Sequence, residues 1–294
     1  MGRRHDTVTF LTDYGRTDEF VGIVHSVLRS IAPHAHVIDL THDIAPYDVR
    51  AGGLLLARSA PWLCPGVVLA VVDPGVGTPR RAIGVEVGDG ASVLVGPDNG
   101  LLAPAVAMCG GATRAVELTS DEHRLESPGP TFDGRDVFAP AAAHLCNGVD
   151  LAELGPLVDP VTLFPGVLPV TREEDGGLVA EVLWVDRFGN AQLNVDPDEL
   201  VPYGDRVALR FNGELRTGVR AATFAEVKVG EIGLVVDSYG LVSVAVDQRS
   251  AATELGLGAG TEVIIEPLGD EEPPGAGIAT PVELGRRGDG GSAG

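Results

Sequence analysis

Apolar and polar residues change their spacing about halfway along the chain, and this change predicts two domains of different architecture. In the first half, short apolar runs alternate with stretches in which apolar residues recur at helical spacing. The run GVVLAVV at 66–72 is typical of a strand buried in the centre of a parallel sheet. We therefore predict an α/β domain over residues 1–168, with a mainly parallel sheet and helices on both faces. The predicted strands are 7–11, 36–40, 66–72, 83–87 and 92–95, and the predicted helices are 18–31, 49–59, 101–108 and 137–145.

A polar, turn-rich stretch at 169–178 is predicted to be a linker. Beyond it, short apolar segments follow one another closely, and Gly, Asp and Pro separate them. This pattern predicts a small antiparallel β-barrel domain over 179–268. The Gly- and Pro-rich segment 269–294 is predicted to be a disordered tail. The predicted barrel strands are 179–185, 191–195, 206–211, 215–219, 232–236, 242–246 and 262–266.

The charge of the chain narrows the range of partners. The sequence holds 42 Asp and Glu against 21 Lys and Arg, a formal net charge of −21. Such acidity disfavours nucleic acids and anionic membrane surfaces, whereas cationic ligands remain compatible with it. Because no signal peptide or long apolar run is present, we expect a cytoplasmic protein. The three widely spaced cysteines suggest neither a zinc site nor a disulfide framework.

Aspartates follow four predicted strands of the first half: Asp13, Asp43, Asp73 and Asp98. Parallel strands bring their carboxyl ends to one edge of a sheet, where ligands bind in open α/β folds. Aspartates also cap turns and helices, which is the plainer explanation for any one of them. As a set they favour a site that holds either a divalent metal for hydrolysis, or sugar hydroxyls together with a cationic ligand. Neither a phosphate-binding loop nor a GxSxG elbow is present.

Six motifs in order make the chain resemble the S-adenosylmethionine (SAM) hydroxide adenosyltransferases, relatives of the fluorinase and chlorinase. The resemblance covers about residues 7–268. It implies an α/β domain followed by a β-barrel, and homotrimers with active sites between the N-terminal domain of one subunit and the C-terminal domain of its neighbour. The implied reaction is attack of water or hydroxide on ribose C5′ of SAM, giving adenosine and L-methionine without a metal or organic cofactor. The motifs are FLTDYG at 10–15, DLTHDIAPYDV at 39–49, VVDPGVGTPRR at 71–81, GPDNG at 96–100, TFDGRDVFAPAAAHL at 131–145 and DRFGN at 186–190.

The same resemblance assigns substrate-binding roles to residues in these motifs. It places Asp13 at the ribose diol and Tyr47 near the ribose or adenine. It places Asp186 and Asn190 at the methionine amino group, although Asn190 could also simply close a turn. Ser238 falls where the methionine carboxylate is bound, while Tyr239 stands where the halogenases have an arginine.

The catalytic group of the hydrolases in this family resembles an Asp-Arg-His triad. Asp73 and Arg80 match the first two members, but Asp133 stands where the family usually has His. Because water has a pKa of about 15.7, attack at neutral pH needs a bound hydroxide or a base that takes the proton. We hypothesise that one of the two carboxylates is the general base and that the other shares Arg80. The halogenases have Tyr where Asp73 stands, and a carboxylate there would repel a halide.

Two other functions fit the same residues. One is a metal-dependent hydrolase that uses the Asp cluster, and the other is a non-catalytic SAM- or adenosine-binding protein, which the missing His would explain.

His144 lies in an Ala-rich predicted helix and is expected to be a core histidine rather than a substitute base. His42, after the second predicted strand, is a weaker candidate for that role.

Overall fold

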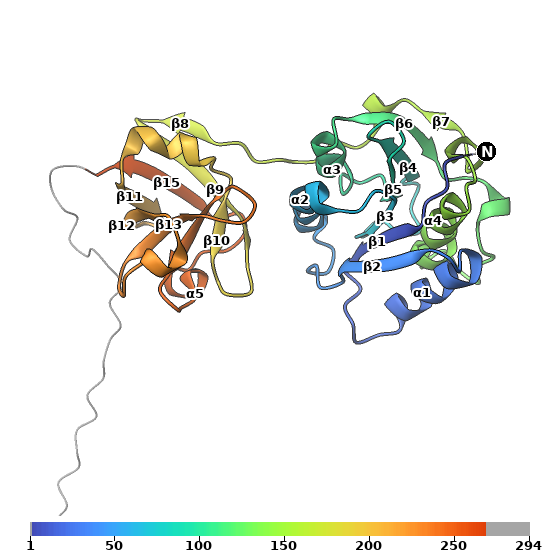
Figure 1. Cartoon of the computed structure of the whole chain (residues 1–294), viewed down its shortest axis with the longest axis horizontal. Helices are drawn as coiled ribbons and strands as arrows, with labels where there is room; N and C mark the ends of the chain where they lie inside the picture. The colour runs from blue at the N-terminus through green and yellow to red at the C-terminus, as the bar shows by residue number, and fades with distance from the viewer. Residues whose placement is uncertain (1, 269–294) are drawn as a thin grey trace, which may run out of the picture. The chain divides into compact units, whose positions relative to one another are not determined.

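The computed structural model describes residues 2–268, so the predicted tail at 269–294 lies outside the described residues (Figure 1). The chain divides into two compact units, Met1–Leu168 and Pro169–Gly294. The stretch predicted to be a linker, 169–178, contains strand β8 (Arg172–Glu174), which pairs with β9 (Gly177–Val185). Within the described residues, no helix has both the length and the apolar character needed to cross a membrane.

The first unit is built on a seven-stranded sheet with the order β2-β1-β3-β5-β4-β6-β7. The four strands β2, β1, β3 and β5 run parallel, and β4, β6 and β7 extend the sheet through antiparallel pairs. The sheet is therefore parallel across β2, β1, β3 and β5, which agrees with the predicted mainly parallel sheet. Its strands are β1 (Thr7–Thr12), β2 (His36–Thr41), β3 (Val67–Val71), β4 (Ala82–Val87), β5 (Ser92–Pro97), β6 (Ala112–Glu117) and β7 (Leu157–Val158).

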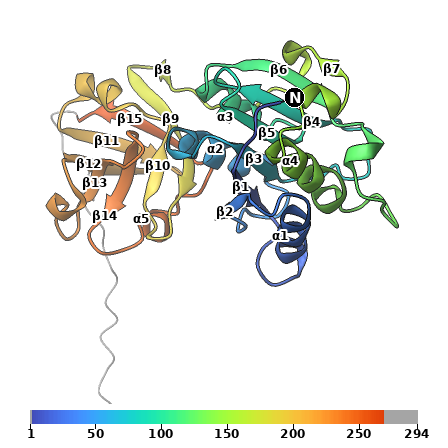
Figure 2. The ribbon, with the colours of Figure 1, turned by 45° about the vertical axis from the view of Figure 1, so that its right-hand side comes forward.

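Helices cover both faces of this sheet, with α1 and α4 on one side and α2 and α3 on the other (Figures 1 and 2). Each face has its own apolar core, and β3, buried along its whole length, contributes side chains to both. Asp48 caps α2 by accepting a hydrogen bond from the N–H of Ala51 at 2.8 Å. The helices are α1 (Phe20–Ile31), α2 (Val49–Ser59), α3 (Ala103–Met108) and α4 (Ala139–Cys146), which follows a π-helical turn, η3 (Gly134–Phe138).

The second unit is a closed barrel. Its strands follow the order β10-β14-β13-β12-β11-β15-β9, and a further pairing of β9 with β10 closes the ring of seven. The inward side chains of the strands form one apolar core. The other strands and the α-helix of this unit are β10 (Ala191–Leu193), β11 (Arg206–Phe211), β12 (Glu214–Ala221), β13 (Ile232–Val236), β14 (Val242–Val246), α5 (Ala251–Leu255) and β15 (Glu262–Pro267).

The barrel departs from the predicted pattern in two places. Strands β12 and β13 run parallel, because the connection between them, which includes the short helix η7 (Phe224–Glu226), crosses over rather than forming a hairpin. The five-residue helix α5 was not predicted, since it is too short to show a helical period.

Candidate functional site

Two neighbouring parallel strands, β1 and β3, bring the predicted site residues Asp13 and Asp73 together. The register pairs Thr12 of β1 with Val71 of β3, so both strands end at the same edge of the sheet. Asp13 follows β1 directly, and Asp73 follows β3 after one more residue. Both side chains line one pocket, whereas Asp43 and Asp98, the other two aspartates of the predicted set, do not line it.

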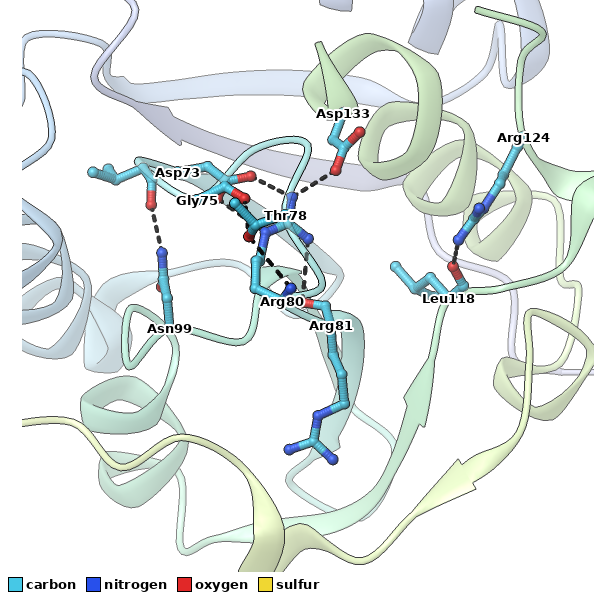
Figure 3. A network of polar contacts seen from close by, with 10 residues as sticks. Asp73, Gly75, Thr78, Arg80, Arg81, Asn99, Leu118, Arg124 and Asp133 are labelled. Carbon is cyan, nitrogen blue, oxygen red and sulfur yellow. Dashed lines mark hydrogen bonds and ion pairs between the residues drawn. The ribbon is translucent and has the colours of Figure 1, made fainter. Parts of the chain in front are cut away.

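Arg80 joins Asp73 to Asp133, as Figure 3 shows. Its Nε donates to Asp73 Oδ1 at 2.9 Å, and its Nη2 donates to the second oxygen, Oδ2, of the same carboxylate. Nη2 also donates to Asp133 Oδ2 at 2.6 Å. Both oxygens of Asp73 are thus held by Arg80. Asp133 is bound through one oxygen, and no hydrogen bond to its Oδ1 occurs among residues 2–268.

The environment keeps Arg80 charged. Its side chain is 11% exposed, Asp73 is 6% exposed and Asp133 is 22% exposed. Burial lowers the pKa of Arg80, but hydrogen bonds and charge attraction from Asp73 and Asp133 outweigh burial and raise it. The guanidinium carbon also lies 5.2 Å from the centre of the Phe138 ring. Two carboxylates therefore share one permanent positive charge at a site largely sheltered from water.

Directly after Asp133, the backbone at Gly134 comes very close to Tyr14, which lines the same pocket. A Cβ built on Gly134 would lie 2.1 Å from the Tyr14 hydroxyl oxygen, so a glycine is needed there. Burial, followed by the charges of Asp13, Asp73 and Asp133, raises the pKa of Tyr14 above its usual value. Tyr14 is therefore a neutral phenol at pH 7 and keeps its hydroxyl proton as a hydrogen-bond donor.

Asp13 fixes the segment that carries Tyr47. The Asp13 Oδ2 atom accepts a hydrogen bond from the Tyr47 backbone N–H at 2.9 Å. Tyr47 has a φ of 69°, an uncommon value for a residue with a side chain, and its ring is largely exposed. One Asp13 oxygen thus holds the Tyr47 backbone, which leaves the other for a ligand.

The pocket lined by these residues has a volume of about 330 Å³. Three aromatic rings form part of its wall: Tyr14, Phe20 and Phe132 pack edge-on or tilted against one another, with centroids 5.1–5.8 Å apart. The sequence reasoning did not select them as site residues, although two of them lie inside the FLTDYG and TFDGRD motifs. Such a wall suits a flat, largely apolar group such as a nucleobase.

The remaining predicted residues lie in a different pocket, on the barrel. It has a volume of about 810 Å³, and Asp186, Asn190 and Ser238 all line it. Trp184 and Phe188 line it as well, and they too were missed by the sequence reasoning. The predicted binding residues therefore lie in two pockets, one on the first unit and one on the barrel.

The DRFGN turn forms a compact loop at this barrel pocket. Asp186 Oδ1 accepts from the backbone N–H groups of Phe188 and Asn190 at 2.9 and 2.8 Å, and the Asn190 amide donates to Oδ2 at 2.8 Å. A Cβ on Gly189, which has a φ of 86°, would meet Ser250 Oγ at 2.1 Å. Asn190 therefore does close a turn, and in doing so it fixes a carboxylate at the pocket wall, where an ammonium group could bind.

Some candidate residues of the first unit do not reach the pocket. Asp98 accepts from Arg81 Nε at 2.8 Å and from the Phe164 backbone N–H at 2.7 Å, so it fastens a loop instead. His42 is fully buried, and His144 packs edge-on against His123 with ring centroids 4.8 Å apart. Neither His42 nor His144 lines the pocket, so neither takes the place of the missing His.

Comparisons with known proteins agree with this arrangement. Residues 8–155 match the family model of the SAM hydroxide adenosyltransferase N-terminal domain, and residues 180–264 match that of the C-terminal domain. The chain is 47% identical to a (R)-S-adenosyl-L-methionine hydrolase of Salinispora tropica, over 86% of this chain and 95% of that protein. It is 29% identical to a fluorinase of Nocardia brasiliensis, over 90% and 97% of the two chains. An uncharacterized conserved protein from Thermotoga maritima has the same fold, with a TM-score of 0.81 and 32% identity over 88% of this chain and 99% of that one. Because these two domain models together match most of the chain, the chain belongs to the SAM hydroxide adenosyltransferase family.

Proposed function

We propose that this protein hydrolyses SAM to adenosine and L-methionine by attack of water on ribose C5′. The observation that carries the proposal is the unequal use of the two carboxylates on Arg80. Asp73 gives both oxygens to the guanidinium, whereas Asp133 gives one and keeps Oδ1 for another partner. Asp133 Oδ1 is therefore the atom that accepts the proton of the attacking water, and Asp73 holds Arg80 in place.

The reaction balances without any further reactant. The water oxygen forms a bond to C5′ as the C5′–S bond breaks, and the electron pair of that bond stays on sulfur. The positively charged sulfonium becomes the neutral thioether of methionine. One water proton remains on the new 5′-hydroxyl of adenosine, and the other passes to Asp133 and then to solvent. Because sulfonium is already a good leaving group, we propose that no metal or organic cofactor takes part.

The charges of the pocket suit a cationic substrate. Three carboxylates, Asp13, Asp73 and Asp133, face the pocket with the single guanidinium of Arg80 behind them. The negative excess attracts a sulfonium, whereas it would repel a halide ion. The free oxygen of Asp13 suits the ribose diol, and the aromatic wall suits the adenine.

The geometry supports this function over a metal-dependent one at the same aspartates. A cation that bound Asp73 and Asp133 together would have to replace Arg80, which already bridges them with charged hydrogen bonds.

We also propose a cytoplasmic location, which the three free cysteines of the chain support.

We further propose that the protein acts as a homotrimer in which the N-terminal pocket of one subunit and the barrel pocket of a neighbour hold one substrate molecule. Two features support this. The methionine-binding candidates Asp186, Asn190 and Ser238 lie on a different unit from the catalytic candidates. The segment before the barrel also carries exposed apolar side chains of the kind that subunit interfaces cover; they are Leu157, Val161, Phe164, Val167, Leu168 and Val170.

Mixing two inactive variants tests the shared site. Asp73→Asn disables the N-terminal pocket, and Asp186→Ala disables the barrel pocket, so each variant alone is expected to be inactive. Co-expressed chains are expected to regain activity, because an intact N-terminal pocket can then meet an intact barrel pocket. Sedimentation is expected to give the mass of three 30.4 kDa chains. Mixed trimers without regained activity would contradict the shared site.

Incubation of the purified protein with SAM tests the function itself. We expect adenosine and methionine to appear in equal amounts, at a rate proportional to enzyme and unaffected by chloride. The Asp73→Asn variant is the matched blank, because the amide keeps the shape of the carboxylate but removes its negative charge. A protein that binds SAM but forms no adenosine above this blank would be a SAM-binding protein rather than a hydrolase.

A further inference from the structure

Two histidines and one aspartate of the first unit meet at a point outside the described pocket. His25 lies on α1, Asp39 lies on β2, and His42 follows β2 directly. His25 Nε2 is 2.8 Å from Asp39 Oδ1, and His42 Nε2 is 3.1 Å from the same oxygen. One ligand atom from each residue lies within 4.8 Å of the other two. Helix α1 and the end of β2 thus direct three metal-binding atoms to one small volume.

The buried histidine of this cluster lacks a partner for one ring nitrogen. His42 is 0% exposed, and its Nε2, which lies 3.1 Å from Asp39 Oδ1, has no hydrogen-bond partner. Its other ring nitrogen, Nδ1, lies 2.9 Å from Thr12 Oγ1. A proton on Nδ1, donated to Thr12, leaves the Nε2 lone pair facing a carboxylate oxygen. Two acceptors this close together repel each other unless a proton or a cation lies between them.

We propose that His25, Asp39 and His42 bind a divalent transition-metal ion, with Zn²⁺ as the expected occupant. Two imidazoles and one carboxylate are the donor set that Zn²⁺ accepts, and a water molecule completes four-coordination. His25 and Asp39 are partly exposed, which gives the ion and the water a way in. If His42 Nδ1 carries the proton, its contact with Thr12 Oγ1 is the outer-shell hydrogen bond that orients a metal-binding imidazole.

The bound ion would brace the loop that carries the ribose-binding candidate. The His42 carbonyl accepts from the Gly15 N–H at 2.8 Å, and Thr12 Oγ1 accepts from the Tyr14 N–H at 3.2 Å. Asp13 lies between these two attachments. None of the three metal ligands lines the substrate pocket, so the ion supports the loop and takes no part in the reaction. This inference does not depend on the proposed hydrolysis.

Titration of the tag-free, chelator-treated full-length protein with Zn²⁺ tests the site. Isothermal titration is expected to show one equivalent bound per chain, and Co²⁺ in its place is expected to give the visible absorption of a four-coordinate ion. Because His42 lies in the core, the test variant is His25→Ala, on the partly exposed face of α1. It is expected to weaken Zn²⁺ binding by more than about 100-fold, since even outer-shell losses cost about 10- to 100-fold.

The control variant is His123→Ala, which alters the other close histidine pair, His123 and His144. Among the described residues, that pair is part of no metal-ligand cluster, so the variant is expected to bind Zn²⁺ as the wild type does. Zn²⁺ is also expected to raise the melting temperature of wild type and His123→Ala but not of His25→Ala. Equal Zn²⁺ affinity in His25→Ala and wild type would overturn the proposal, as would no binding by the wild type. The first result would mean that the ion binds elsewhere. The second would mean that the cluster holds a proton only.

Discussion

Arg80→Met is expected to lower kcat for adenosine formation by about 10³-fold or more, the upper range for loss of a single preorganised charge donor. Methionine fills a similar space but cannot donate to Asp73 or Asp133. The two carboxylates would then repel each other, and Asp133 would no longer be held where the water attacks. Because Asp73 is 6% exposed, the loss also leaves a buried charge without its partner, which costs about 3–5 kcal/mol of folding stability.

Arg81→Met is the matched control for this change. Arg81 is the next residue, and its side chain binds Asp98 and Thr162 outside the pocket. Figure 3 shows this side chain pointing away from Asp73 and Asp133. We expect this variant to lose some stability and to keep its kcat within a factor of about three of the wild type, as for a change outside the reacting groups. Initial rates and urea unfolding, measured on both variants, separate loss of chemistry from loss of fold. A folded Arg80→Met enzyme with wild-type kcat would contradict the role given to Arg80.

Asp133→Asn is expected to lower kcat by about 10²- to 10⁴-fold, the range for removal of a general base. Asparagine keeps the shape of the side chain and, through its carbonyl oxygen, can still accept from Arg80 Nη2. It cannot take a proton from water at Oδ1. KM for SAM is expected to change little, because Asp133 acts on the water and Asp13 acts on the substrate.

Asp133→His places the family's usual residue at this position. It tests more specifically whether the side chain at position 133 is the general base. We expect this variant to be active, with a rate that falls as the pH drops through about 6.5, because only the neutral imidazole accepts a proton. A pH–rate profile of kcat measures this. If Asp133→Asn keeps full adenosine production while Asp73→Asn does not, the base has been assigned to the wrong carboxylate.

The positions of the site residues that directly follow parallel strands could be predicted from the sequence. Asp13 and Asp73 were predicted to meet because parallel strands end at one edge of a sheet, and β1 and β3 do pair directly. The helix over 49–59 and the strands over 206–211 and 232–236 appear at the predicted bounds.

The features that were not predicted depend on contacts between residues far apart in the sequence. Asp98 follows a strand just as Asp73 does, but Arg81 and a distant backbone N–H at Phe164 hold it outside the pocket. Strand β6 (Ala112–Glu117) was missed because its segment, ATRAVE, is weakly apolar, and its strand structure depends on pairing with β4 and β7. No pattern in the sequence marked the contact of Tyr14 with Gly134, which depends on the fold of the whole unit.

The central claim is that water attacks C5′ of SAM, and the position of an oxygen isotope tests it most directly. SAM is incubated with the chelator-treated enzyme in ¹⁸O-water, with Asp133→Asn as the blank, and the products are analysed by mass spectrometry. We predict that the label appears in the 5′-oxygen of adenosine and that methionine carries none. Adenosine without the label, or label in homoserine beside methylthioadenosine, would show that water does not attack at C5′ and would contradict the account.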